Sequence, residues 1–99
     1  MDEFVQINIE FNNKAKNIFF SLYEKFAESV KQLNRRKDDN VFQQQLGKYL
    51  KTLKSQLENL AMEMLDKNKS TKNISQLNKK LADEINIYLG EFRQKSRSL

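Results

Sequence analysis

Residues 46–65 read LGKYLKTLKSQLENLAMEML and place an apolar side chain at every third or fourth position. The positions form one seam, which consists of Leu46, Leu50, Leu53, Leu57, Leu60 and Met64. Steps that alternate between four and three are the heptad pattern of a helix that buries one face. The seam is widened by flanking apolar residues, namely Phe42, Tyr49, Ala61 and Leu65. The stretch therefore predicts an amphipathic helix over about 39–67.

The same periodicity continues on both sides of this helix. Apolar residues recur from Phe4 to Leu33 at an average spacing close to 3.6, which predicts a helix over about 2–36. Its first residues allow a strand as well, because apolar and polar residues alternate between Val5 and Phe11. Helix is favoured there, since a strand needs a partner strand that the chain does not offer. Steps of three and four from Ile74 to Phe92 predict a third helix over about 71–95.

Two polar joints separate the predicted helices, at 34–40 and 66–73. Asp38 or Asp39 is expected to cap the second helix, and Ser70 or Thr71 the third. Joints of this length force neighbouring helices to run antiparallel. We therefore expect residues 1–99 to form one all-α domain, an antiparallel three-helix bundle with coiled-coil-like packing that is dimeric. The first helix is expected to extend about two turns beyond its partners, and residues 94–99 are expected to be poorly ordered.

The composition argues against catalysis. The chain has no His, no Cys and only two Gly, so the groups that most often supply acid–base catalysis, metal ligands and phosphate-binding loops are missing. We expect no enzyme activity, no catalytic residue, no cofactor, no bound metal and no small-molecule substrate. No apolar run is long enough to span a membrane, and Asp2 and Glu3 stand where a signal peptide would be basic. A cytoplasmic location is expected.

The excess of positive charge has several interpretations, of which binding to an anionic membrane or to another acidic partner is the least favoured. The formal net charge is +5, and most of the imbalance lies in the last third of the chain. Cations near helix C-termini complement the helix dipole, which explains much of this pattern without a ligand. Alternatively, Arg93, Lys95 and Arg97 are phosphate contacts of a nucleic-acid-associated protein that uses its basic C-terminal third. The dipole interpretation is favoured, and nucleic-acid association is retained as the alternative function.

A second apolar stripe is expected on the first helix. At 100° per residue, several apolar residues fall away from the main stripe, and we call them the α1 stripe: Val5, Ile9, Phe20, Tyr23 and Ala27. Two lone apolar residues, Met62 and Ile87, also lie off the core faces of their helices. The α1 stripe is expected to bind a protein partner, namely a second copy in a homodimer, although it could instead wrap the monomer's own core. The expected function is a non-catalytic protein–protein interaction module: a small adaptor, assembly factor or regulator.

Overall fold

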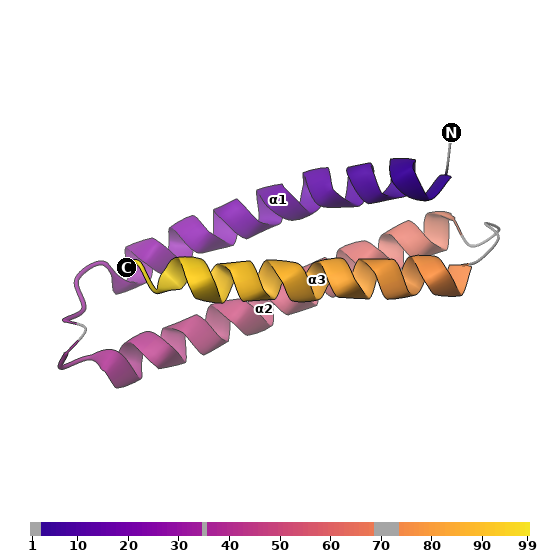
Figure 1. Ribbon diagram of the computed structural model, residues 1–99. Helices are drawn as coiled ribbons and strands as arrows, with labels where there is room; N and C mark the ends of the chain where they lie inside the picture. The colour runs from indigo at the N-terminus through magenta and orange to yellow at the C-terminus, as the bar shows by residue number, and fades with distance from the viewer. Residues whose placement is uncertain (1–2, 35, 69–73) are drawn as a thin grey trace.

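The computed structural model describes residues 3–34, 36–68 and 74–99, which contain three helices. They are α1 (Glu3–Val30), α2 (Asp39–Lys67) and α3 (Ile74–Ser96). The helices lie side by side along one long axis in a body of 53 × 18 × 17 Å (Figure 1). The described residues include no strand. The prediction of an all-α fold is confirmed, and the strand alternative for the start of the chain is wrong from Glu3 onward.

α1 ends six residues earlier than predicted, at Val30 rather than at residue 36. The chain then leaves the helix through a turn in which the Leu33 N–H donates to the Val30 carbonyl at 3.0 Å. Leu33 packs against the core from this turn. With 28 residues, α1 is no longer than α2, which has 29. The expectation that the first helix is about two turns longer than its partners is therefore wrong for α2, whereas α1 does exceed α3, which has 23 residues.

Asp38 closes the first joint instead of capping α2 with its side chain. Its carboxylate accepts a hydrogen bond from the Asn34 backbone N–H at 2.9 Å, and its own N–H donates to the Asn34 carbonyl at 2.6 Å. Asp38 occupies the N-cap position, but its side chain makes no capping hydrogen bond with α2. Asp39 lies in the first turn of α2, where a negative charge complements the helix dipole. The predicted caps of α3, Ser70 and Thr71, lie outside the described residues.

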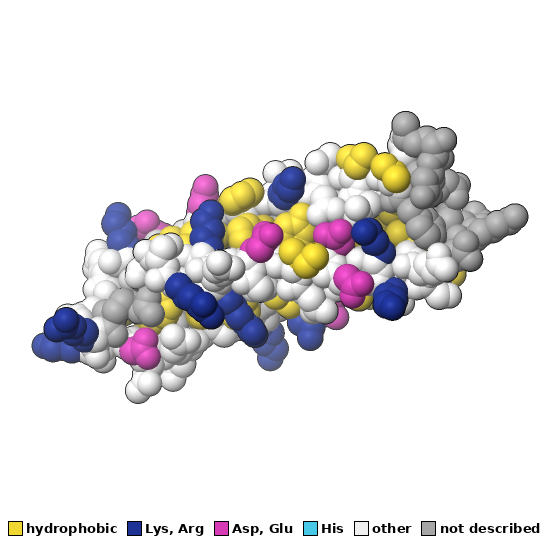
Figure 2. Space-filling model, viewed as in Figure 1, with side chains coloured by type: hydrophobic (Ala, Val, Ile, Leu, Met, Phe, Trp, Pro, Cys, Tyr) yellow, Lys and Arg dark blue, Asp and Glu magenta, His cyan; other side chains and the backbone are white. Residues whose placement is uncertain are grey.

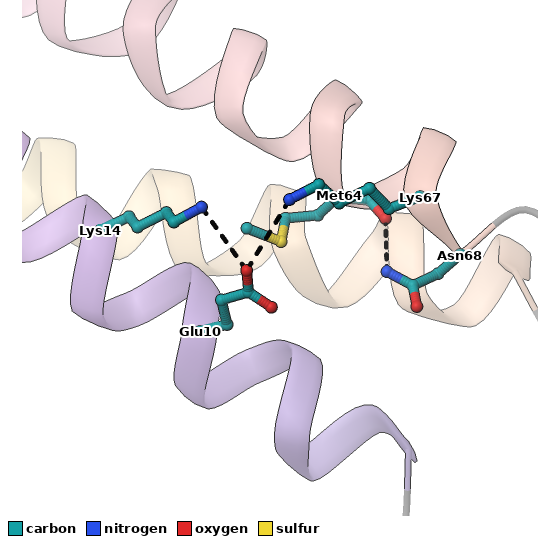
Figure 3. Close-up of polar contacts among 5 residues, drawn as sticks. All are labelled: Glu10, Lys14, Met64, Lys67 and Asn68. Atoms are coloured by element: carbon teal, nitrogen blue, oxygen red, sulfur yellow. Dashed lines mark hydrogen bonds and ion pairs between the residues drawn. The ribbon is translucent and has the colours of Figure 1, made fainter.

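The C-terminus of α2 is closed by an asparagine. The Asn68 side-chain amide donates to the Met64 carbonyl at 2.7 Å (Figure 3). The Asn68 backbone N–H donates to the Leu65 carbonyl at 3.2 Å. Near this end Glu10 of α1 lies between two lysines, with oxygen–nitrogen distances of 3.5 Å to Lys14 and 4.0 Å to Lys67 (Figure 3). These groups are about half exposed, so the ion pairs contribute little to stability.

Aromatic rings join the three helices at the end of the molecule that holds the C-terminus of α1. Phe26 of α1 is fully buried. Its ring centroid lies 5.4 Å from that of Phe42 on α2 and 5.6 Å from that of Phe92 on α3. Phe92 in turn lies 5.3 Å from Tyr23. The predicted seam of α2 is buried in the monomer over its second half, whereas Leu46 and Leu50 are only partly buried.

Tyr88 links α3 to α1 through a hydrogen bond. The Tyr88 hydroxyl donates to the Asn12 side-chain oxygen at 2.6 Å, and the Asn12 amide donates to the Asn8 carbonyl at 2.8 Å. Burial raises the pKa of the Tyr88 hydroxyl, and the negative charges of Glu84 and Glu91 act in the same direction. The hydroxyl therefore stays protonated and keeps its donor role at neutral pH.

The tail packs on the body of the molecule as far as Ser96, contrary to the expectation of poor order from residue 94 onward, whereas residues 97–99 are exposed and non-helical. The Tyr23 hydroxyl donates to the Lys95 carbonyl at 3.0 Å. Ser96 is only 2% exposed and donates from its hydroxyl to the Arg93 carbonyl at 2.6 Å. The sequence pattern ended at Phe92 because a serine does not register as a core residue. Ser96 continues that stripe one turn further.

Candidate interaction surfaces

The part of the chain that the structure describes offers no cluster of side chains suited to a metal. No group of three or more Asp or Glu side chains converges there. Among the described helices, none is long and apolar enough to cross a membrane.

The structure divides the predicted α1 stripe. Three of its members are about half exposed: Val5 at 47%, Ile9 at 55% and Phe20 at 50%. Figure 2 shows hydrophobic side chains on the surface over the N-terminal half of α1. Tyr23, in contrast, is 8% exposed and belongs to the core, and Ala27 is partly buried against it. Tyr23 is therefore not part of an exposed stripe, contrary to the prediction.

Tyr23 turns inward because the buried face of α1 winds around the helix. Its buried positions mostly recur every four residues, from Ile7 through Phe11, Ala15 and Phe19, and then at Leu22, Phe26 and Val30. Steps longer than 3.6 residues rotate the stripe, by about 140° between Ile7 and Val30 at 100° per residue. The direction that faces solvent at Val5 therefore faces the core at Tyr23. A helical wheel with a fixed core direction could not find this.

Phe20 is covered on one side by the end of α3. The Lys95 ammonium lies 5.0 Å from the Phe20 ring centroid and 4.7 Å from that of Tyr23. Both distances are within the range of cation–π attraction. Of the predicted phosphate contacts, Lys95 is thus directed toward α1. It lies apart from the groove that Arg93 and Arg97 line.

Arg93 and Arg97 line one groove between α2 and α3. Two adjoining hollows there, of about 450 and 520 Å³, share Gly47, Leu50 and Arg93. We call this surface the basic groove. Its apolar floor contains three partly buried leucines, Leu46, Leu50 and Leu89. Its cations come from both sides of the groove: Lys51 and Lys54 on α2, Arg93 on α3, and Arg97 just beyond the end of α3. No acidic side chain is among the described residues that line either hollow.

Sequence reasoning missed the α2 half of this groove. Figure 2 shows several Lys and Arg side chains gathered along the lower edge of the molecule, where α2 emerges beneath α3. The sequence does carry a signal, since Lys48, Lys51 and Lys54 occur in a stretch of α2, from Asn40 to Leu57, without any acidic residue. These lysines are far from the helix C-terminus at Lys67, so the helix dipole does not explain them.

No family model, curated protein or solved structure matches the chain.

Proposed function

We propose that the protein is a non-catalytic protein–protein interaction module, acting as a small adaptor, assembly factor or regulator through the outer faces of its helices. The observation that carries the proposal is the exposure of large apolar side chains on helices whose core is complete without them. Val5 and Ile9 lie one turn apart on α1, and Phe20 lies three turns further along. Apolar side chains grouped on one helix face are typical of an interface.

Self-association through the N-terminal half of α1 is the form of interaction that we propose first. The exposed members of the α1 stripe are Val5, Ile9 and Phe20, because Tyr23 is buried and Ala27 is partly buried against the core. Two copies of α1 related by a two-fold axis would cover each other's exposed side chains, which is the usual arrangement in homodimers. We thus propose that the protein is an antiparallel three-helix bundle that forms a dimer in the cytoplasm.

Replacing Ile9 with aspartate is expected to turn a dimer into a monomer without loss of helical structure. The charge would be buried in the interface, and an unpaired buried charge is strongly unfavourable. Sedimentation velocity at increasing protein concentration measures the association, and circular dichroism measures the helicity. Ile87→Asp is a matched control, because Ile87 on α3 is 54% exposed and Ile9 is 55% exposed. A wild-type protein that stays monomeric near 1 mM, or equal dissociation of the Ile87→Asp variant, would contradict self-association through α1.

Nucleic-acid association is the second candidate function. It is supported by the basic groove, where Lys51 and Lys54 add to Arg93 and Arg97. Phosphate contacts release counterions, so such binding weakens steeply with salt.

A salt titration of binding to generic duplex DNA tests this candidate. If the four cations of the basic groove contact phosphates, the slope of log K against log salt is expected to be about −3 to −4. Arg93→Glu together with Arg97→Glu is expected to reduce the steepness of that slope by about half. Binding that is undetectable near physiological salt, or a slope that this double substitution leaves unchanged, would argue against phosphate contacts in the groove.

A further inference from the structure

We propose that the basic groove between α2 and α3 binds an acidic amphipathic helix of a partner protein. This inference rests on the proposed role as an interaction module, and it assigns a second surface and the chemistry of its ligand. The groove lies between α2 and α3, and none of the exposed residues of the α1 stripe lines it.

The floor of the groove is suited to apolar side chains. Leu46 and Leu50 lie one helical turn apart on α2, and Leu89 of α3 lines the same hollow as Leu50. All three pack against the core yet remain partly exposed. An incoming helix with apolar residues at every third or fourth position would bury this remaining surface in the way that helix-in-groove complexes do.

The charges that line the groove determine the sign of the charge that its ligand must carry. Lys51, Lys54, Arg93 and Arg97 surround the leucines, and no acidic residue among those described lines the two hollows. Like charges brought opposite each other are costly, and opposite charges favour and orient binding. The matching helix therefore carries Asp or Glu on both sides of its apolar stripe. A second copy of the same groove is excluded, because its four cations would face four cations.

The two glycines of the chain both line this groove, Gly47 on α2 and Gly90 on α3. A Cβ atom added at either position would meet nothing within 4 Å. Packing within the monomer therefore does not require glycine, although each glycine lowers helix stability by about 1 kcal/mol relative to alanine. The missing side chains leave the hollow open, so that another backbone can approach closely.

A phosphate backbone fits the groove less well than such a helix. Phosphates would satisfy the cations, but they would leave Leu46, Leu50 and Leu89 in contact with water. An amphipathic acidic helix would pair its carboxylates with the cations and would also bury the three leucines of the floor. Nucleic acid is therefore an alternative outcome of the test below.

The test uses synthetic helical peptides of about 18 residues, which at 1.5 Å per residue are long enough to span the groove. One peptide carries leucine on one face and glutamate elsewhere. A second replaces glutamate with lysine, and a third keeps the glutamates but has no leucine. Fluorescence anisotropy at about 150 mM salt measures the binding of each to the full chain. We expect the leucine–glutamate peptide to bind at least about tenfold more tightly than either of the others.

Charge reversal in the groove is the decisive comparison. Lys54→Glu together with Arg93→Glu is expected to weaken binding of the leucine–glutamate peptide by about tenfold or more. The matched control is Lys16→Glu together with Lys25→Glu, two exposed cations of α1 that do not line the groove. It makes the same change in net charge and is expected to alter the affinity by less than about threefold, because distant surface charges are screened by salt.

A third variant tests the shape of the groove. Gly47→Leu places a side chain in the open hollow and introduces a better helix former. It is expected to keep or raise the melting temperature while weakening peptide binding by about tenfold. Retained stability with lost binding separates occlusion of the groove from misfolding.

Several outcomes would overturn this inference. The first is that the leucine–glutamate peptide does not bind at about 1 mM. The second is that the Lys16→Glu, Lys25→Glu control loses as much affinity as the groove variant. The third is that the peptide without leucine binds as tightly as the leucine–glutamate peptide. Tighter, groove-dependent binding of duplex DNA at the same salt would assign the groove to nucleic acid instead. Ile9 lies outside the groove, so the Ile9→Asp variant is expected to bind the peptide as tightly as the wild type does. A failure of the proposed helix binding in the groove can thus be distinguished from a failure of the proposed self-association through α1.

Discussion

Replacing Phe26 with alanine is expected to lower the free energy of unfolding by about 3–5 kcal/mol. Phe26 is fully buried, and its ring centroid lies within 5.6 Å of the rings of Phe42, Tyr49 and Phe92. The substitution therefore opens a cavity where all three helices meet. Domains of this size have total stabilities of about 5–15 kcal/mol, so the substitution is expected to remove a large fraction of the stability of the protein.

Urea denaturation followed by circular dichroism measures this loss. Phe20→Ala is the matched control, because Phe20 is on the same helix but 50% exposed, and its removal is expected to cost less than about 1 kcal/mol. Phe26→Leu retains most of the volume and is expected to fall between the two. A Phe26→Ala variant within about 1 kcal/mol of the wild type would contradict the arrangement of the aromatic cluster.

The helices could be predicted from periodicity because each buries one continuous face. α2 begins at Asp39 and ends at Lys67, as its Leu seam predicted. α3 ends at Ser96, one residue beyond the prediction. The end of α1 was misplaced because Leu33 continues the apolar spacing, although it packs against the core from a turn. Spacing alone does not distinguish a helix from a turn that returns an apolar side chain to the same core.

The candidate surfaces were harder to predict because they depend on the relation between helices. Val5, Ile9 and Phe20 were correctly placed on the surface, since their positions depend only on α1. Tyr23 was misplaced because the core direction rotates along that helix. The basic groove combines Lys51 and Lys54 with Arg93 and Arg97, which are about 40 residues apart in the sequence. Only the packing of α2 on α3 brings these cations together.

The placement of the tail depends on one small side chain. Ser96 is 2% exposed, and it follows Phe92 at the spacing of one helical turn. A serine at a core position is satisfied by its own helix, here through the Arg93 carbonyl. A pattern search that counts only apolar residues ends at Phe92. The tail therefore contributes to the fold although its composition is polar.

Ending the chain after Arg93 is expected to lower the melting temperature by about 10–20 °C. The Tyr23 hydroxyl would lose its acceptor, the Lys95 carbonyl at 3.0 Å. Exchange of this intramolecular hydrogen bond for one with water costs about 0.5–1.5 kcal/mol, and the packing of Ser96 is lost as well. The Lys95 ammonium would also be lost from the rings of Phe20 and Tyr23, at a further cost of about 0.5–1 kcal/mol.

Lys95→Ala is the control that separates these two contributions, because it removes the ammonium but keeps the backbone carbonyl. It is expected to lower the melting temperature by only a few degrees, about 4–8 °C per kcal/mol lost. Burial raises the pKa of the Tyr23 hydroxyl, which a hydrogen bond with Ser98 partly offsets, so the hydroxyl remains a donor at neutral pH. Thermal unfolding followed by circular dichroism at pH 7 measures all three proteins. A truncated chain that melts within about 3 °C of the full chain would show that the tail does not contribute to the fold, and the packing of Ser96 against the body of the molecule would then be wrong.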